Sequence, residues 1–548
     1  MKKSVIRFGA GLLAAMLLFT GCGMDGRKAG SSGNAEGTAK VSKPNEFPIV
    51  EEPVELAIFT TKPTGVEDIT TNEFTKWYEE KTNVKIKWDL ISGDARQAIN
   101  IKLASDDYSD IFLGFSFAKS EQSTYYDQGV YIDMTDVVDK HGYYIKKMFE
   151  ENPSIEKELR HTDNMLLGLS DEVGNFEGSA PHKMWLYKPW MDKLGLEVPT
   201  TTDELYEVLK AFKEKDPNGN GKADEIPLAA RGQFGSEIGL DIFLMNAFLP
   251  WGRYGFTNID GKAVFAPIQE EAKEGIRYIK KLYDEGLIHT DSFVMDRSRV
   301  TALAENEVPI LGAATGRWTT QFTAAGTSNR MNEYIPMPPL SSPVSKARTT
   351  GAGGSGGCTT FSITTDCEEP AVAVKWIDWF YSMDGYLASK STDGTRLAKE
   401  GEIGLDGTQA ILTVEPAESG ATFDGIQNVR WSGNFIPGYL AEEVSFKTAD
   451  FTADAERKKT SYGAYQLYKP FEERGVVIND FPMPTEVGEE YLELRTNFMS
   501  AISSGVVGFI IGEKDIDKDW DAYVANFENI GLERYTEIIQ EYAIDAQK

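Results

Sequence analysis

The hydrophobic pattern of residues 54–115 changes repeatedly between the period of a strand and that of a helix. It predicts strands over residues 54–60, 84–90 and 111–115 and helices over residues 72–81 and 95–104. In the first helix, Phe74, Trp77 and Tyr78 share one face, so we expect all three in the core. Strands alternating with helices are typical of an α/β lobe with a mainly parallel sheet, which binds ligands at the carboxyl ends of its strands.

A similar alternation continues through the rest of the chain, without an internal repeat. It predicts strands over residues 184–187, 226–230, 308–313 and 360–364, and helices over residues 201–215, 270–285, 371–383, 520–527 and 534–542. Thr202 is the expected N-cap of the helix over 201–215, in which Leu205, Leu209 and Phe212 form the apolar stripe.

The N-terminal segment has the features of an export signal followed by a tether. Lys2, Lys3 and Arg7 precede an apolar run over residues 8–19, which is shorter than the about 20 residues that span a bilayer. A buried N-terminal helix is the alternative, but the order of charged, apolar and small residues favours a signal. Residues 23–48 are rich in Gly, Ser, Ala and Lys, which predicts a flexible tether.

The end of the apolar run resembles the cleavage box of bacterial lipoproteins, in which a small residue precedes a lipid-modified cysteine. Gly21 and Cys22 occupy those positions, whereas Phe19 stands where the family usually has Leu. The resemblance implies a signal peptide over residues 1–21, a lipidated Cys22 and a tether over residues 22–48. The protein is then expected at the extracellular face of the cell membrane, held by its lipid anchor.

Composition narrows the range of functions. The 548 residues include 56 basic and 85 acidic side chains, and the net charge of −29 argues against nucleic acid as a general partner. Three cysteines form no disulfide framework, and Cys358 and Cys367 flank a predicted strand, so we expect two free thiols. The Gly-rich run 351–357 fits two catalytic patterns but lacks the preceding strand and following helix that both require.

Residues 216–225, with the sequence DPNGNGKADE, carry the most specific local signal. Oxygen ligands at alternate positions, with Gly221 for the sharp turn, match the first half of a calcium loop of the EF-hand type. The usual Glu at position twelve is absent, since Pro227 stands there, and Asp224 and Glu225 could close the site instead. A solvated Asn-Gly turn without metal is the alternative.

The chain resembles, over most of residues 50–548, the extracellular solute-binding lipoproteins that serve ABC importers in Gram-positive bacteria, and four segments carry the resemblance. They are residues 84–112, 184–228, 302–318 and 509–542. The resemblance implies an α/β fold of the type II periplasmic-binding class, with two lobes joined by a hinge and extra C-terminal helices. Lobe 1 would comprise residues 49–168 and 350–400, and lobe 2 residues 169–349 and 401–548.

Relatives that bind oligosaccharides such as alginate fragments carry a loop like residues 216–225. Carried over by position, the resemblance implies a structural Ca²⁺ held away from the cleft. Its ligands would be Asp216, Asn218, Asn220, the backbone oxygen of Lys222, Asp224 and Glu225.

Sugars present apolar CH faces and rings of hydroxyl groups, so a sugar site needs aromatic platforms and polar side chains in a cleft. Trp318 is the first candidate, because it lies in a Gly-rich turn after an apolar strand, where the resemblance puts a sugar-stacking Trp. Arg317 could bind hydroxyl groups or a carboxylate. Phe115, Ser116, Phe234 and Trp431 are further candidates, each of which could instead serve packing alone.

The resemblance implies a monomeric, non-enzymatic protein that captures an extracellular carbohydrate, an oligosaccharide by preference, and delivers it to an ABC permease. Two alternatives stay open. The same fold could bind a peptide or a signalling ligand, or the chain could be a surface enzyme acting on glycans. The absence of a recognisable hydrolase motif argues against the enzyme.

Overall fold

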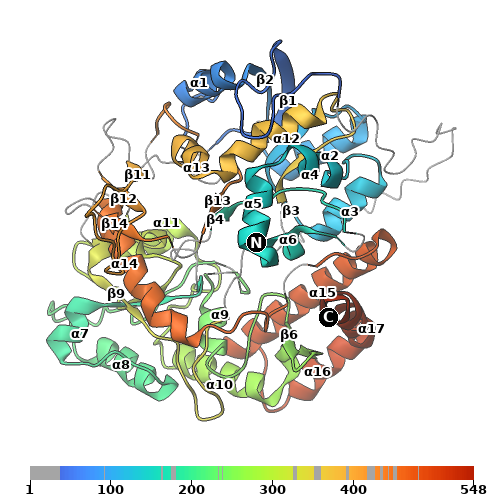
Figure 1. Ribbon diagram of the computed structural model, residues 1–548. Coiled ribbons are helices and arrows are strands. Elements are labelled where there is room, and N and C mark those ends of the chain that lie inside the picture. The colour runs from blue at the N-terminus through green and yellow to red at the C-terminus, as the bar shows by residue number, and fades with distance from the viewer. Residues whose placement is uncertain are drawn as a thin grey trace, which may run out of the picture.

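A computed structural model describes residues 37–547, except residues 64, 92, 162–163, 174–179, 233, 237, 325–329, 351–358, 391–393, 416–425, 432–435, 442–443, 449–452 and 479–480. Two large hydrophobic cores divide the described residues into two lobes, which lie one above the other in Figure 1. This two-lobed α/β architecture confirms the predicted fold class. The predicted signal peptide, Cys22 and Cys358 lie outside the described residues.

Lobe 1, the upper lobe in Figure 1, is built on a four-stranded sheet in the order β10-β3-β1-β2. Its strands are β1 (Val54–Thr61), β2 (Val84–Ile91), β3 (Ile111–Phe117) and β10 (Thr359–Ile363). β1 is parallel to β2 and β3, and β10 is antiparallel to β3. The prediction of a mainly parallel sheet is therefore confirmed, and the carboxyl ends of β1, β2 and β3 share one edge.

Seven helices of the described residues pack around this sheet in lobe 1. They are α1 (Glu73–Thr82), α2 (Ala95–Ser105), α3 (Lys119–Asp127), α4 (Thr135–His141), α5 (Tyr144–Glu151), α6 (Pro153–Leu159) and α12 (Pro370–Asp378). Phe74 and Tyr78 of α1 are buried as predicted. Trp77 is not, since 44% of its surface is exposed at the edge of α1. The helical face that enters the core is thus narrower than the apolar spacing suggested.

Lobe 2 contains a three-stranded sheet in the order β8-β5-β9. The strands are β5 (Met184–Tyr187), β8 (Ala313–Thr315) and β9 (Tyr334–Met337), and both outer strands are antiparallel to β5. The predicted strand over 226–230 is wrong, because this segment forms only single bridges, such as the parallel bridge from Ala229 to Ala314. The predicted strand over 308–313 is also wrong over most of its length, since only Ala313 belongs to β8 and Leu311 forms a single bridge with Ile226.

Helices surround this sheet. Some of them precede the stretch of the chain that returns to lobe 1, and the others follow it. They are α7 (Lys188–Leu194), α8 (Thr202–Glu214), α9 (Leu240–Met245), α10 (Glu270–Asp284), α11 (Arg297–Ala304), α14 (Ala453–Tyr468), α15 (Thr485–Ile510), α16 (Trp520–Asn529) and α17 (Leu532–Ile538). Thr201, not Thr202, caps α8, since its side chain accepts from the N–H of Glu204 at 3.1 Å. Within the described residues, no helix combines the length and hydropathy needed to cross a membrane.

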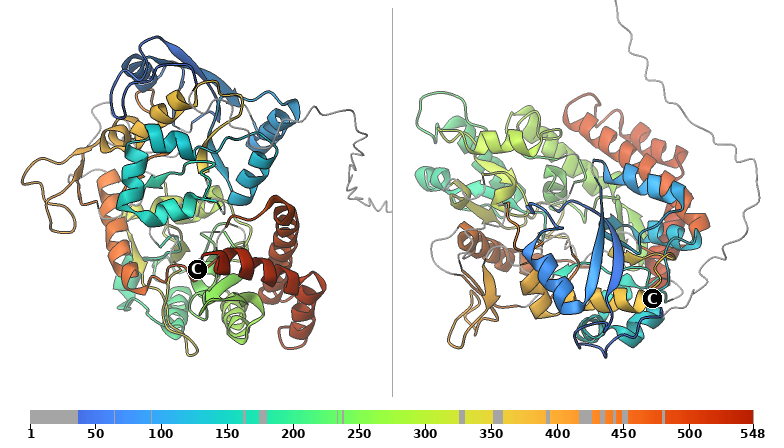
Figure 2. Two further views of the ribbon diagram at one scale, coloured as in Figure 1. Left: turned by 45° about the vertical axis from the view of Figure 1, so that its right-hand side comes forward. Right: turned by 90° about the horizontal axis from the view of Figure 1, so that it is seen from above.

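The segment after residue 400, predicted for lobe 2, does not belong wholly to that lobe. Trp431 and Ile436 lie in the core of lobe 1. A separate small sheet, β11-β12-β14, is formed by β11 (Thr395–Leu397), β12 (Leu412–Val414) and β14 (Phe446–Thr448). The return to lobe 2 therefore comes later than predicted, near α14. The lobes also approach each other through α3 and α15, which lie side by side (Figures 1 and 2).

Residues 37–48, which we call the N-terminal strap, pack against lobe 1, so the prediction of a flexible tether is wrong for them. The Glu369 carboxylate accepts from the N–H of Thr38 at 3.0 Å and from the N–H of Ala39 at 2.9 Å. The Lys375 ammonium donates to the backbone oxygen of Ser42 at 3.0 Å. These partners lie over 300 residues along the chain, which local composition does not reveal.

Candidate functional site

Two loops of lobe 2 meet at the end of its sheet. Residues 226–229 run parallel to residues 311–314, so the residues that follow, from Arg231 and from Gly316, leave the sheet at the same edge. The Thr315 hydroxyl donates to the backbone oxygen of Ile238 at 2.7 Å, which ties the two loops together. The edge therefore contains the loop over 231–239 and the segment over 315–321.

Trp318 and Arg317 lie on this edge. Both are half-buried, and the Arg317 guanidinium carbon is 5.5 Å from the centroid of the Trp318 ring. The Arg317 N–H donates to the Oε1 of Gln321 at 2.6 Å, so the turn after β8 is closed by its own side chain. Trp318 stands immediately before the short 3₁₀ helix Thr319–Gln321. A partly exposed indole on a closed turn can serve as a stacking platform.

Arg231 is a second cation at this edge, and it belongs to no motif that would single it out in the sequence. Its side chain is half-buried, its Nε atom is buried, and it makes no hydrogen bond or ion pair within the described residues. Burial and the positive charge of Arg297 both lower the pKa of Arg231. Arg297 in turn donates to the backbone oxygen of Thr320 at 2.9 Å, two residues beyond Trp318.

Phe234 lies on the same loop as Arg231. It is half-buried against the core of lobe 2, with its ring 6.3 Å from that of Trp251 and nearly perpendicular to it. The next residue, Gly235, donates its N–H to the Oδ2 of Asp241 at 3.0 Å. Asp241 is only 1% exposed, and burial raises its pKa to about 7. The loop therefore rests on a buried carboxyl group.

Of the three predicted ligand residues in lobe 1, only Ser116 is accessible to a ligand. Ser116 is exposed near the carboxyl end of β3, whereas Phe115 is 5% exposed and packs against Phe59 and Phe112. Trp431 is 1% exposed, and its indole N–H donates to the Thr75 hydroxyl at 2.7 Å inside the aromatic core of lobe 1. Since a ring sealed in a core offers no face to a ligand, we assign Phe115 and Trp431 to packing.

The loop over residues 216–225 folds around the Asp216 carboxylate. Its Oδ1 accepts from the N–H groups of Gly219 at 2.9 Å and Asn220 at 3.1 Å, and its Oδ2 accepts from that of Gly221 at 3.1 Å. Gly219 and Gly221 have positive φ angles of 76° and 73°, which side chains other than glycine adopt at a cost. The loop thus has the backbone turns of a cation-binding loop.

Asp224 lies opposite Asp216 in this loop and accepts from the amide groups of Asn218 at 2.9 Å and Asn220 at 3.0 Å. These hydrogen bonds lower the pKa of Asp224. Turning each amide about its final bond would exchange nitrogen for oxygen and present both amide oxygens to a cation beside Asp224.

Glu225 provides the test of whether the loop fits calcium. Its Oε1 atom is buried and has no hydrogen-bond partner within the described residues. Burial and the charges of Asp216 and Asp224 raise its pKa. A hard cation prefers such an all-oxygen set, so the donors fit Ca²⁺. In the described part of the chain, however, no three or more His, Cys, Asp and Glu side chains converge as a metal cluster.

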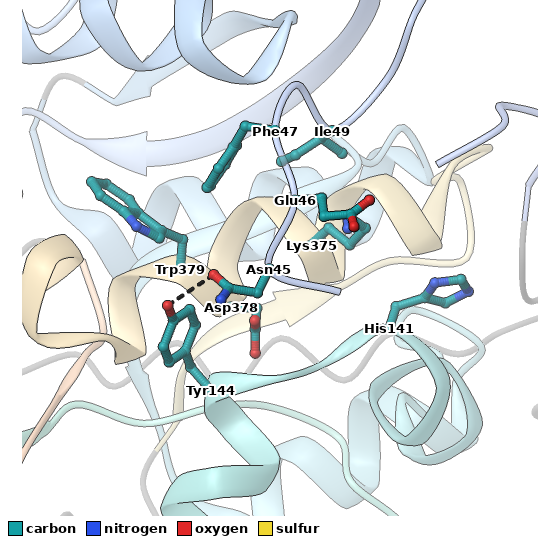
Figure 3. A pocket seen from close by; sticks show the side chains of 9 residues that line it. All are labelled: Asn45, Glu46, Phe47, Ile49, His141, Tyr144, Lys375, Asp378 and Trp379. Atoms are coloured by element: carbon teal, nitrogen blue, oxygen red, sulfur yellow. Dashed lines mark hydrogen bonds between the residues drawn. The ribbon is translucent and has the colours of Figure 1, made fainter. Parts of the chain in front are cut away.

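A small pocket lies elsewhere, between the N-terminal strap and lobe 1 (Figure 3). It is lined by Asn45, Glu46, Phe47, Ile49, His141, Tyr144, Lys375, Asp378 and Trp379. The Tyr144 hydroxyl donates to the Oδ1 of Asn45 at 2.8 Å, the dashed contact in Figure 3. None of the predicted ligand residues lines this pocket, and we assign it to the docking of the strap.

Two comparisons of sequence place the chain among known proteins. The family described as bacterial extracellular solute-binding protein matches residues 62–386. The fructooligosaccharide ABC transporter substrate-binding protein FusA of Streptococcus pneumoniae serotype 4 is 25% identical over 546 residues, which cover 97% of this chain and 96% of FusA.

Solved structures agree on the fold. An extracellular solute-binding protein from Bifidobacterium longum subsp. infantis superimposes with a TM-score of 0.74 at 24% identity, covering 90% of this chain and 98% of that one. An EF-hand mutant of S. pneumoniae FusA in complex with fructo-nystose gives a TM-score of 0.70 at 23% identity, covering 89% and 98%.

Proposed function

Because the chain belongs to the bacterial extracellular solute-binding proteins, we propose that it is the substrate-binding component of an ABC importer for oligosaccharides. FusA, which is similar to this chain over nearly its whole length, is such a component for fructooligosaccharides. The ligand would be captured outside the cell and handed, uncleaved, to the permease subunits of the importer.

The observation that carries this proposal is the half-buried Trp318 at the sheet edge of lobe 2, with arginine side chains beside it. The indole face would stack on the apolar face of a sugar ring. The Arg317 and Arg231 guanidinium groups would donate to ring substituents, and Phe234 and Ser116 are weaker candidates from the two lobes. Closure of the lobes would then be a ligand-biased equilibrium, since only the closed form offers both lobes to one sugar.

We further propose that residues 216–225 bind a structural Ca²⁺. Asp216, Asn218, Asn220, the backbone oxygen of Lys222, Asp224 and Glu225 would hold it. The unpartnered buried Oε1 of Glu225 supports this assignment, and the naming of an EF-hand in FusA agrees with it. A bound Ca²⁺ would neutralise the clustered carboxylates and cross-link the loop.

The N-terminal segment supports a location at the extracellular face of the membrane. Gly21 and Cys22 follow a charged and then apolar segment, as in lipoprotein signals. Lipid on Cys22 would leave residues 23–36 as the linker to the strap on lobe 1. Labelling of the expressed protein with a radioactive fatty acid, and loss of label in Cys22→Ala, would test this anchor.

The test of the main proposal is a thermal-shift and calorimetric screen of the purified mature chain against sugars, oligosaccharides and peptides. A ligand at 100 times its Kd should stabilise the fold by about 2.7 kcal/mol. Trp318→Ala should weaken binding of the identified ligand by about tenfold or more, with loss of the tryptophan fluorescence change. Trp77→Ala, which removes an exposed indole from α1, is the matched control and should bind as the wild type does.

Three outcomes would contradict the proposal. Stabilisation by peptides alone would mean that the fold serves another ligand class. Recovery of a cleaved sugar would identify an enzyme. Equal binding by Trp318→Ala and Trp77→Ala would show that the ligand does not bind at the Trp318 edge of lobe 2.

A further inference from the structure

Arg231, Arg297 and Arg317 lie near the same sheet edge of lobe 2, in a protein with a large excess of acids. Arg297 lies close enough to Arg231 for its charge to lower the Arg231 pKa, and Arg317 lies against Trp318. Basic side chains are outnumbered by 56 to 85 in the whole chain, so this gathering does not reflect composition. It brings three guanidinium groups to one edge of lobe 2.

Several other arginines of the described residues are paired with carboxylates. Examples are Arg160 with Glu156, Arg348 with Glu473, Arg396 with Glu402 and Arg534 with Glu490. Arg231 differs, because its side chain has no hydrogen bond or ion pair in the described part of the chain, although its Nε is buried. An arginine stays protonated even when burial opposes its charge, so an unpaired one is costly.

The nearby acids that the structure describes have other partners. Asp291 forms an ion pair with Arg299, and the Asp296 side chain accepts from the N–H of Arg299 as the N-cap of α11. Asp241 lies beneath the same loop, but its carboxyl group accepts from Gly235, and burial favours its neutral form. Among the described residues, therefore, no carboxylate pairs with the Arg231 guanidinium group.

We propose that the ligand is an acidic oligosaccharide, and that Arg231 binds a sugar carboxylate while Trp318 stacks on the ring. A guanidinium group binds a carboxylate through two parallel hydrogen bonds, which a neutral hydroxyl cannot match. Arg297, which is exposed and holds the segment after Trp318, adds a second positive charge to the same place. This inference rests on the proposed sugar-binding function and names the charge of its substrate.

The experiment compares two ligands that differ only in charge: a galacturonic acid trimer and its fully methyl-esterified form. Calorimetry at low ionic strength should show tighter binding of the acidic trimer, by about 10- to 100-fold. Arg231→Gln should remove most of this difference, and added salt should reduce it. Arg231→Lys keeps the charge without the two-pronged geometry, so it should retain part of the preference.

Arg299→Gln is the matched control, since it removes one positive charge from α11 and should keep the preference of the wild type. The melting temperature of each variant establishes that it is folded. Binding of the esterified trimer, or of neutral kestose, without any preference for acid would overturn this inference and leave the proposed function standing. Equal loss in Arg299→Gln would overturn the assignment to Arg231. Failure of every sugar to bind would overturn both.

Discussion

Asp241 shows how one buried group can make stability depend on pH. Its carboxyl group is 1% exposed, and burial raises its pKa to about 7, well above the 3.8 of a free side chain. Between these values the folded protein binds a proton that the unfolded chain does not. The stabilisation is therefore complete at acid pH and is lost as the pH rises from about 4 to about 7, with an upper limit of roughly 4 kcal/mol.

Asp241→Asn replaces the protonated acid by a neutral group of the same shape that can still accept from the Gly235 N–H. We expect the variant to match the wild type at pH 4.5 and to melt at a higher temperature at pH 8. Calorimetric melting of both proteins across this range measures the difference. A difference that does not change with pH would show that Asp241 is already ionised in the fold.

The calcium loop can be tested at single side chains. Chelation should lower the melting temperature of the wild type, and Ca²⁺ at 100 times its Kd should restore about 2.7 kcal/mol. Asp216→Ala should lose this response because it removes the acceptor of three backbone N–H groups. Lys222→Ala should keep it, since only the backbone oxygen of Lys222 would bind the ion. A response to Ca²⁺ in Asp216→Ala would place the ion elsewhere.

At the scale of residues, the sequence indicates which side chains could bind a sugar, but it does not show which of them the fold buries. Trp318 lies half-exposed on a turn, as expected of a platform. Trp431 has equally polar neighbours in sequence, yet it is buried, because the chain returns to lobe 1 after residue 430 and closes an aromatic core. Arg231 follows no motif. Its significance comes from missing partners and from Arg297, both of which depend on tertiary structure.

At the scale of elements, the N-terminal strap gives a clear prediction. The Glu369 carboxylate accepts from two backbone N–H groups and from the Thr38 hydroxyl at 2.7 Å. Glu369→Ala should free the start of the strap without unfolding lobe 1. We expect faster hydrogen exchange and proteolysis that are confined to residues 37–48. The free energy of unfolding should fall by only about 1–2 kcal/mol, which gives a small decrease in melting temperature.

Glu368→Ala is the control for this variant, since Glu368 is the exposed neighbouring acid. Unchanged exchange of the strap in Glu369→Ala would mean that Lys375 and the packing of Phe47 on Trp379 hold it alone. Exchange that rises throughout lobe 1 would instead make the strap a part of the folding unit.

The elements that periodicity predicted correctly are those with a full apolar face of their own. α1, α8, α10 and α16, and strands β1 to β3, lie within one or two residues of their predicted ranges. The apolar residues over 226–230 predict a strand, but the segment forms only isolated bridges. The strap has almost no apolar pattern and is held by polar contacts to distant residues, so its own sequence could not reveal its docking.

At the scale of the molecule, the family resemblance predicted the two lobes correctly, but it did not predict where the chain passes from one lobe to the other. Residues 431 and 436 complete the core of lobe 1 long after the chain was expected to have left it. In the described part of the chain, the hydrogen bonds of the strap to distant residues run to lobe 1. A lipid on Cys22 would therefore restrain lobe 1 directly and lobe 2 only through the connecting segments, which leaves lobe 2 the freer body.

This arrangement leads to a prediction about closure. If Trp318 and the arginines of lobe 2 hold the ligand, its binding should draw lobe 1 over it, and small-angle scattering should record a smaller radius of gyration. A compact chain of this length has a radius of gyration of roughly 24 Å, which sets the scale of the measurement. Trp318→Ala at the same ligand concentration should keep the larger value, because the equilibrium shifts only as far as differential binding allows. Glu369→Ala should close like the wild type, since the strap lies on lobe 1. If Trp318→Ala shows the same decrease in radius of gyration as the wild type, the ligand is held by residues outside this edge.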